Sequence, residues 1–451
     1  MYPVVYPDTA KELDHRLIAE YGLSESALID SAARNVLEAS QSRLKGRLVF
    51  LIGPGNNGSD GLEMARLCKK DGLDVSICYL YAKGNRENLR RREAVAALAQ
   101  VDDAKGFDTV IDAMFGFSFH GEPDERTKAV VESISGFTIA IDVPSAGIVR
   151  ADLTVTLMSR KAGLYLPSLR AMSGEIEFRN PGFPEKELET SPDKLYLLTY
   201  QDSQIRKFSL SDYKNTRGHL LIIGGSDRYT GAPRLAARSA FAAGAGLVSI
   251  MTSSEKVRDE NPAVMIVPPG GGLERMSAIA LGPGWDEGDD SLLSSSVESG
   301  KPLVIDADAL RHAHKHKYGW RAVLTPHVGE YKRLMNALGL PSGLEAAETL
   351  SSSLRALSKT LEAVVVLKAS TLWITSGDEV YIYDGAEPSL GVAGSGDVLT
   401  GAIGALLGEG ESPLRAAIDG VILHQRAGKR AHADYGYYSA EELILSLGRE
   451  R

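Results

Sequence analysis

The chain has 451 residues, of which 43% are hydrophobic and 24% are charged, and its formal net charge is −9. Domains commonly hold about 100 to 200 residues, so this length predicts two or three domains, and we expect two. The negative charge argues against nucleic acid or an anionic membrane as a partner, and no apolar run approaches the roughly 20 residues of a membrane span.

The first residues, "MYPVVYPDTAKELDH", lack the basic and then apolar order of a signal peptide, so we expect a cytoplasmic protein. The sequence has only two cysteines, Cys68 and Cys78, which are too few for a disulfide framework. Neither has the neighbouring cysteine and histidine ligands that a zinc site needs. We expect both to be buried thiols.

Strand and helix patterns alternate along the first 180 residues. Residues 8–40 have apolar side chains at helical spacing, broken at "YGLSES", and residues 86–100 are also helical. Such alternation predicts a parallel sheet with helices on both faces, which is an α/β fold. The expected strands are 47–52, 74–81, 109–115 and 138–143.

A second α/β pattern follows residues 180–212, which are rich in proline, serine and charge and are typical of a linker. The pattern restarts with "GHLLIIGGS" at 218–226 and continues through a helix at 232–245 to a probable hairpin, "LWITSGDEVYIYD". We expect one domain over 1–205, Rossmann-like with three αβα layers, and another αβα domain over 206–451.

The loop "GPGNNGSDG", residues 53–61, joins the strand at 47–52 to a helix. Such a loop turns backbone N–H groups and the positive end of the helix dipole toward an anion, commonly a phosphate. Its spacing fits neither the dinucleotide fingerprint nor a P-loop. Asn56, Asn57 and Asp60 could hold a cation or orient a ligand, although these residue types also occur in turns for conformational reasons.

Two further segments, "DAMFGFSFHG" (112–121) and "IDVPSAG" (141–147), carry an acid at the end of an expected strand. The carboxyl ends of parallel strands meet at one crevice, where ligands bind. The sequence therefore predicts that these two segments and the glycine-rich loop form one site.

These three motifs, with "LDHRLIAEYGLSESALIDSAARNV", resemble the NAD(P)H-hydrate epimerase family over about the first 180 residues. The resemblance implies a potassium ion held by Asn57, Asp112 and Ser145, and Asp142 as a proton-transfer base. Ser59 and Ala146 replace the glycines usual in the family and are expected to narrow the pocket. The implied substrate contacts are Asn56, Asn57, Gly58, Ser59, Asp60, Gly116, Phe117, Ser118, Phe119, His120, Gly121, Glu122 and Asp142.

In the second half, "GSGDVLTG" (394–401) places Asp397 in the first turn of a helix. An anion hole beside a carboxylate suits phosphoryl transfer, because the N–H groups of Ser395 and Gly396 can receive negative charge while the acid accepts a hydroxyl proton. The alternative is an aspartate placed only for the helix dipole.

Together with "IDADAL", "TPHVGEYKRL" and the segment 224–248, this motif resembles the ADP- or ATP-dependent NAD(P)H-hydrate dehydratases, which have a ribokinase-like fold. The match runs from about residue 215 to the end. The resemblance implies Mg²⁺ with ADP or ATP, ADP being preferred, and Glu330 as a residue that helps to place the metal. Implied hydrate contacts are Ala232, Gly284, His327 and Asp397, and implied nucleotide contacts are Lys368, Ala369, Ser370, Thr371, Leu372 and Gly396.

The two resemblances imply a bifunctional enzyme that epimerises the R and S hydrates of NADH and NADPH and dehydrates the S form with ADP or ATP. Asp142 and Asp397 are its expected catalytic residues. We also expect a homo-oligomer that acts on small molecules. Two alternatives stay open: a ribokinase-like small-molecule kinase with a nucleotide-binding regulatory domain, and a binding protein without activity.

Overall fold

The structure is a computed structural model that describes residues 1–117, 119, 121–184, 192–258, 261–270, 272–286, 288 and 290–451. The chain forms two compact units, Tyr2–Leu195 and Tyr196–Arg451, and Met1 joins the latter. The sequence placed this boundary at 205/206. Residues just after Leu195 pack on the C-terminal unit: Tyr196 stacks on Tyr381, with ring centroids 5.6 Å apart, and the Gln204 N–H donates to Asp419 Oδ1 at 2.8 Å.

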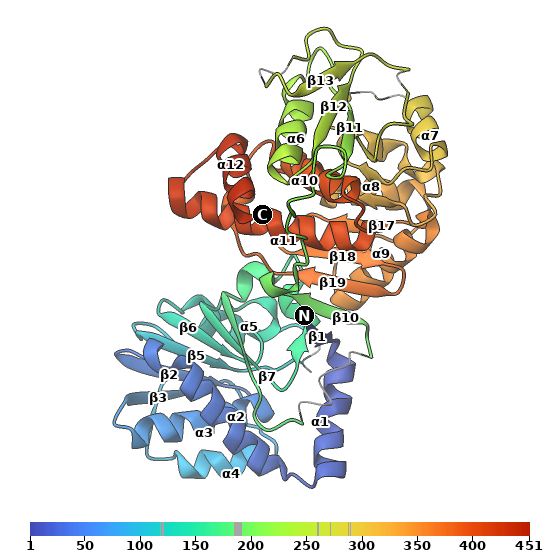
Figure 1. Cartoon of the computed structure of the whole chain (residues 1–451). Helices are drawn as coiled ribbons and strands as arrows, with labels where there is room; N and C mark the ends of the chain where they lie inside the picture. Colours follow the sequence, from blue (N-terminus) through green and yellow to red (C-terminus); the bar gives the residue numbers. More distant parts are fainter. Residues whose placement is uncertain are drawn as a thin grey trace. The chain divides into compact units, whose positions relative to one another are not determined.

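The N-terminal unit contains a parallel sheet with strand order β4-β3-β2-β5-β6-β7-β9 (Figure 1). Two shorter strands, β1 and β8, also pair in parallel. The strands of the unit are β1 (Tyr2–Val5), β2 (Arg47–Ile52), β3 (Asp74–Tyr79), β4 (Ala99–Gln100), β5 (Thr109–Ala113), β6 (Phe137–Ile141), β7 (Leu153–Leu157), β8 (Arg160–Lys161) and β9 (Glu175–Arg179). Its α-helices are α1 (Pro7–Tyr21), α2 (Glu25–Ser40), α3 (Asn56–Lys70), α4 (Arg86–Ala94) and α5 (Glu125–Glu132).

Both faces of this sheet are buried, which explains why its central strands are continuous apolar runs. On β2, Phe50 packs with α2 and α3 on one face, whereas Val49 packs with Val130 of α5 on the other. The chain builds outward from β2 to β3 and β4 on one side and from β5 onward on the other. The carboxyl ends of β2 and β5 therefore form the switch point at which such folds bind ligands.

The C-terminal unit is also built around a parallel sheet, with the strand order β13-β12-β11-β14-β15-β16-β17. The antiparallel strands β18 and β19 follow β17. The hairpin expected at "LWITSGDEVYIYD" is β18–β19. Its strands are β11 (His219–Ile223), β12 (Leu247–Met251), β13 (Val264–Val267), β14 (Ala278–Leu281), β15 (Leu303–Ile305), β16 (Ala322–Leu324), β17 (Val364–Leu367), β18 (Leu372–Ser376) and β19 (Glu379–Tyr383). The strand β10 (Leu195–Leu198) spans the boundary between the units.

Small side chains let the helices of the C-terminal unit pack closely. Helices α6, α10, α11 and α12 share one apolar core with the sheet, while α9 packs against β17 and β18. Among the described residues, no helix combines the length and the apolar character that a membrane span requires. The α-helices are α6 (Gly231–Ala242), α7 (Asp290–Glu298), α8 (Val328–Ala337), α9 (Ala347–Leu361), α10 (Ser395–Gly408), α11 (Pro413–Tyr435) and α12 (Ala440–Glu450). The α/β class is confirmed for both units.

Candidate active sites

The glycine-rich loop is shaped by close packing between β2, β5 and α3. A Cβ atom on Gly53 would lie 1.6 Å from the Met114 carbonyl oxygen, and one on Gly58 would lie 2.2 Å from the Gly53 carbonyl oxygen. Gly55 is different, because nothing lies within 4 Å of an added Cβ. Gly53 therefore allows the end of β2 to approach the end of β5, and Gly58 allows the first turn of α3 to approach the end of β2.

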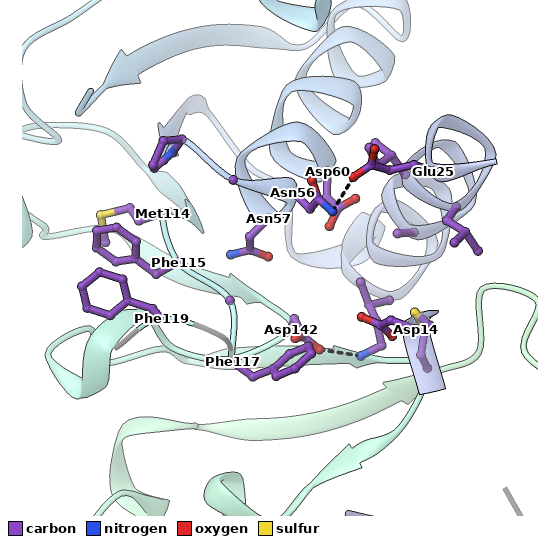
Figure 2. A pocket seen from close by; sticks show the side chains of 18 of the residues that line it. Asp14, Glu25, Asn56, Asn57, Asp60, Met114, Phe115, Phe117, Phe119 and Asp142 are labelled. Atoms are coloured by element: carbon purple, nitrogen blue, oxygen red, sulfur yellow. Dashed lines mark hydrogen bonds between the residues drawn. The ribbon is translucent and has the colours of Figure 1, made fainter. Parts of the chain in front are cut away.

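A cavity of about 550 Å³ opens at this switch point (Figure 2). It gathers residues from all three motifs of the N-terminal half, as the sequence predicted. Residues of α1 and α2 complete its wall. Its lining residues include Asp14, Glu25, Asn56, Asn57, Asp60, Phe115, Gly116, Phe117, Phe119, Asp142 and Lys161.

Asp142 follows β6 with a left-handed backbone, φ 69°. Aspartate tolerates this conformation better than most residues. Its Oδ1 accepts hydrogen bonds from Lys161 Nζ at 2.5 Å and from the Leu157 N–H at 3.1 Å. Lys161, whose ammonium also donates to the Leu157 carbonyl oxygen and lies 5.2 Å from the Phe117 ring centroid, was missed by the sequence reasoning. It ends β8, a strand of two residues that the sequence pattern did not predict.

Two more carboxyl groups face the same cavity. Burial raises the pKa of Asp14 to about 6, although the Lys161 ammonium lowers it. Burial, with the nearby Asp142 carboxylate, raises the pKa of Asp60 well above its usual range. The cavity can therefore hold neutral carboxylic acids near neutral pH.

Of the three residues expected to hold potassium, Asp112 and Ser145 contact each other, and Asn57 lies beside Gly116. Asp112 is fully buried and accepts from Ser145 through Oγ at 2.6 Å and through the backbone N–H at 2.8 Å. Burial raises the pKa of Asp112 to about 6, while these hydrogen bonds lower it. Asn57 Cβ would lie 3.7 Å from a Cβ on Gly116, and its buried amide nitrogen has no hydrogen-bonding partner among the described residues.

This arrangement fits a hard cation. A buried carboxylate, a hydroxyl and an amide supply the oxygen ligands that such ions prefer. The positive charge would also offset the cost of burying ionised Asp112. In the described part of the chain, no cluster of three or more histidine, cysteine, aspartate or glutamate residues could hold a metal.

Other substrate contacts expected in the N-terminal unit are not found at the large cavity. Gly58 is buried in the loop packing, Gly121 and Glu122 are exposed away from the cavity, and Ser118 and His120 fall outside the described residues. The Ser59 hydroxyl turns back to the Gly55 carbonyl oxygen at 3.3 Å, so it does not narrow the cavity. Ala146, with φ 53°, lines a smaller neighbouring cavity of about 240 Å³.

In the C-terminal unit, α10 begins after Gly394, whose φ is 89°. The Ser395 N–H already donates to the Val392 carbonyl oxygen at 3.2 Å, which corrects its expected part in an anion hole. The N–H groups of Gly396 and Asp397, in the first turn, are the ones left for an anion. Burial first, and then nearby Asp306, raise the pKa of Asp397 to about 7.

Asp306 is a second acid at this site that the sequence reasoning did not assign. It is almost fully buried, and its oxygens contact Lys368 Nζ and Thr400 Oγ1, each at 2.7 Å. A Cβ on Gly396 would lie 3.4 Å from Lys368 Nζ, so this ammonium sits beside the first turn of α10. Like Asp112, Asp306 ends a parallel strand, and that position was the signal for it.

His327 and Glu330 join this site through α8. His327 Nδ1 accepts from the Gly329 N–H at 2.9 Å, and Glu330 Oε2 accepts from the His327 N–H at 2.8 Å, so they cap the helix reciprocally. A parallel bridge sets His327 beside Lys368. Burial raises the pKa of Glu330, and Asp306 adds to the effect.

The remaining expected contacts divide into two groups. Ala232 and Gly284 meet, because a Cβ on Gly284 would lie 3.2 Å from Ala232 Cβ. In the segment Lys368–Leu372, the Thr371 hydroxyl accepts from Trp373 Nε1 at 3.0 Å in the core, and Leu372 is buried in β18. Their side chains therefore serve packing, and Ala369 and Ser370 are the more accessible members.

A buried histidine supports the start of α10. His424 of α11 lies 3.0 Å from the Ser395 carbonyl oxygen and 3.1 Å from its hydroxyl, both through Nε2. Burial lowers the pKa of His424 to about 4, so the imidazole is neutral at neutral pH. Nothing in its sequence neighbourhood distinguishes it from an ordinary core histidine.

Fold and sites thus define a two-domain α/β protein, with a cavity at the switch point of the N-terminal sheet and a cluster of acids and Lys368 at the start of α10 in the C-terminal unit. A family model described as NAD(P)H-hydrate dehydratase matches residues 220–448, and one described as YjeF-related protein N-terminus matches residues 25–163. A crystal structure of a ribokinase-like superfamily protein from Enterococcus faecalis V583 is similar in fold, with a TM-score of 0.51 at 21% identity, and covers 58% of this chain and 96% of that one.

Whole-length relatives agree with these matches. The bifunctional NAD(P)H-hydrate repair enzyme Nnr of Coxiella burnetii is 31% identical over 94% of both chains. The Escherichia coli K12 enzyme of the same name is 29% identical over 89% of this chain and 84% of its own. The chain belongs to the family of bifunctional NAD(P)H-hydrate repair enzymes, which confirms the resemblances found in the sequence.

Proposed function

We propose that the chain repairs hydrated NADH and NADPH in two steps, epimerising the R and S hydrates in the N-terminal unit and dehydrating the S hydrate with ADP or ATP in the C-terminal unit. The observation that carries the proposal is Asp397: a buried carboxyl group, with its pKa raised to about 7, beside the N–H groups of Gly396 and Asp397, for which the described part of the chain shows no backbone acceptor. A base poised near neutral pH next to an anion site suits hydroxyl phosphorylation.

Dehydration requires the hydrate to lose a poor leaving group. Hydroxide is the conjugate base of water, whose pKa is about 15.7, whereas phosphate has a relevant pKa of about 6. Asp397 accepts the hydroxyl proton while the oxygen attacks the terminal phosphorus of the nucleotide. The ring nitrogen's lone pair then expels phosphate to form a carbon–nitrogen double bond, and loss of a proton from the neighbouring ring carbon to water regenerates the dihydropyridine.

Gly396 and Lys368 receive the transferred phosphoryl group in this scheme. The Gly396 N–H points from the helix start, and the Lys368 ammonium lies beside it. Lys368 was first expected among the nucleotide contacts, and its pairing with Asp306 supports a position at the phosphate end. Mg²⁺ commonly uses one or two carboxylates with substrate phosphates, and Glu330 is the carboxylate we assign to it. Bound Mg²⁺ supplies charge neutralisation.

Hydrate and nucleotide occupy different parts of the C-terminal site. Ala232, Gly284 and His327 contact the hydrate, whereas the Lys368–Leu372 segment, through its backbone at Thr371 and Leu372, contacts the nucleotide. The first assignment is supported by the close approach of Ala232, on the helix that follows β11, and Gly284, after the neighbouring strand β14.

In the N-terminal unit, Asp142 transfers a proton during epimerisation. Lys161 holds this carboxylate toward the cavity, and Phe115, Phe117 and Phe119 exclude water from it. Asn57, Asp112 and Ser145 hold K⁺, which supplies a fixed positive charge at the carboxyl end of β5. The protein acts in the cytoplasm as a homo-oligomer.

The test incubates the purified chain with a chromatographically separated hydrate epimer and Mg²⁺, with ADP and ATP in parallel, and follows NADPH absorbance. Full recovery from either epimer is expected, with one nucleotide phosphate bond consumed per NADPH. Asp142→Ala should recover only the S hydrate. A stable phosphorylated product would instead identify a small-molecule kinase, and binding without turnover would identify a binding protein.

A further inference from the structure

The N-terminal cavity holds more carboxyl groups than cations. Asp14, Asp60 and Asp142 all line it, and Lys161 is the cation that lines it among the described residues. Figure 2 shows Asp14 and Asp60 on helices and Asp142 across the cavity from Asp60. The exposed Glu25 also lines the cavity, so its described residues supply four carboxyl groups and one ammonium. Lys161 can offset only one carboxylate, and burial favours the neutral form of Asp14 and Asp60.

Asp14 and Asp142 have different surroundings. Asp142 Oδ1 is held by Lys161 Nζ, by the Leu157 N–H and by Thr156 Oγ1 at 3.4 Å. Within the described part of the chain, no hydrogen bond or ion pair closer than 4 Å holds the Asp14 carboxyl group. Asp14 is thus available to a ligand, whereas Asp142 is fixed in place by its neighbours.

The groups facing Asp14 come from several elements. Lys161 of β8 favours its ionised form, and so does His15 of α1, whereas Asp142 disfavours it. Asp60 of α3 is electrostatically coupled to Asp14, and Glu25 lies at the same cavity wall. With burial dominating, the pKa of Asp14 is about 6, which suits a group that gives and takes protons near neutral pH.

We propose that Asp14 is the second proton-transfer residue of the epimerase site, working with Asp142 from a different wall of the cavity; this inference rests on the proposed epimerase function. Asp14 lies on α1, before the residues that match the N-terminal family model. Neither the sequence motifs nor the matched segment assigns it a role.

In the proposed epimerisation, Asp14 gives one proton and Asp142 takes one. Asp14 gives its proton to the hydroxyl oxygen, the carbon–oxygen bond breaks, and water leaves while the ring nitrogen's lone pair forms a carbon–nitrogen double bond. Water then adds to the opposite face, the double-bond electrons return to nitrogen, and Asp142 takes the proton that the water releases. The opposite epimer reacts in reverse, with Asp142 as the donor. Lys161 stabilises whichever carboxylate is ionised.

Asp60 has a different part in this scheme. Burial, with the nearby Asp142 adding to the effect, raises the pKa of Asp60 well above its usual range, which favours its protonated form. A group that keeps its proton serves as a hydrogen-bond donor to the substrate. Asp14, which exchanges its proton near neutrality, is better suited to the transfer step.

The test uses the full chain carrying Asp397→Asn, so that dehydration does not drain the hydrates. Starting from the epimer for which Asp14 is the donor, the approach to equilibrium is followed by chromatography. We expect Asp14→Asn to lower the turnover rate about 100- to 1,000-fold, with the dissociation constant for the hydrate changing less than about threefold. Asp14→Glu should restore part of the rate. Asp8→Asn, on the exposed side of the same helix, is the matched control.

The pH profile separates proton transfer from a structural role. In the direction that uses Asp14 as donor, the epimerisation rate should fall as pH rises through about 6, because Asp14 loses its proton. The Asp14→Asn variant should not show this fall in rate. An Asp14→Asn rate and pH profile equal to those of Asp8→Asn would overturn the inference while leaving the function intact. Absence of epimerisation by the unmodified N-terminal site would instead reject the proposed function.

Folding is checked separately. In a chain with Asp397 intact, Asp14→Asn should still dehydrate the S hydrate at the unaltered rate, because Asp14 lies in the N-terminal unit. Loss of hydrate binding by both Asp14→Asn and Asp14→Glu would overturn the inference, since it would mean that Asp14 holds the cavity together.

Discussion

Lys161 Nζ lies 2.5 Å from Asp142 Oδ1, and both side chains are buried in the N-terminal unit. Removing one partner of a buried ion pair leaves an uncompensated charge and typically costs about 3–5 kcal/mol. We therefore expect Lys161→Met to destabilise this unit by about that amount and to abolish epimerisation. Lys128→Met, which breaks an exposed pair with Glu125, should leave the stability of this unit nearly unchanged.

The two units can be followed separately for this measurement. Trp285, Trp320 and Trp373 all belong to the C-terminal unit, so tryptophan fluorescence follows its unfolding while far-UV circular dichroism follows both units. Lys161→Met should lower the midpoint of the transition seen only by circular dichroism. An unchanged dichroism transition would show that the pair contributes nothing to stability.

The glycines at positions 53 and 55 allow the same substitution to be compared in two environments. Gly53→Ala would drive Cβ into the Met114 carbonyl oxygen, and we expect it to cost about 3 kcal/mol or more and to displace the wall of the cavity. Gly55→Ala meets nothing within 4 Å and should change the free energy of unfolding by less than about 1 kcal/mol. Urea unfolding of both variants, with dehydratase activity as the folding check, measures the difference.

The contrast between these glycines shows what the sequence can predict. The loop, the acids after the strands and the switch-point crevice follow from the order of strands and helices, because parallel strand ends must meet at one edge. Which glycine is needed for packing depends on Met114, a residue of another motif. Similarly, Lys161 belongs to none of the sequence motifs, and Asp14 belongs to a helical segment to which the sequence assigned no site residue, so only the folded chain relates them to Asp142.

Potassium should stabilise the N-terminal unit if Asp112 and Ser145 hold it. Binding to the folded state raises stability with the logarithm of ligand concentration. Replacing tetramethylammonium chloride by potassium chloride at equal ionic strength should raise the thermal midpoint seen by circular dichroism. Asp112→Asn should remove that increase, and exposed Asp103→Asn should keep it. Equal midpoints in the two salts would contradict the assignment.

The dehydration rate should depend on pH through Asp397. The pKa of this group is about 7, and a general base acts only when it is ionised, so the turnover rate should rise as pH increases through about 7. The Asp306 carboxylate raises this pKa, whereas the Lys368 ammonium lowers it. Asp306→Asn should therefore move the rising limb toward lower pH, and Lys368→Met should move it toward higher pH.

Asp308→Asn is the matched control for these variants. Asp308, like Asp306, follows β15, but its carboxylate accepts a hydrogen bond from the Asp286 N–H. Its rising limb should coincide with that of the unmodified chain. The measurement is the turnover rate at saturating hydrate and nucleotide from pH 5.5 to 9. Because the two neighbours act on Asp397 in opposite senses, limbs that move together, or that do not move, would contradict its assignment as the base.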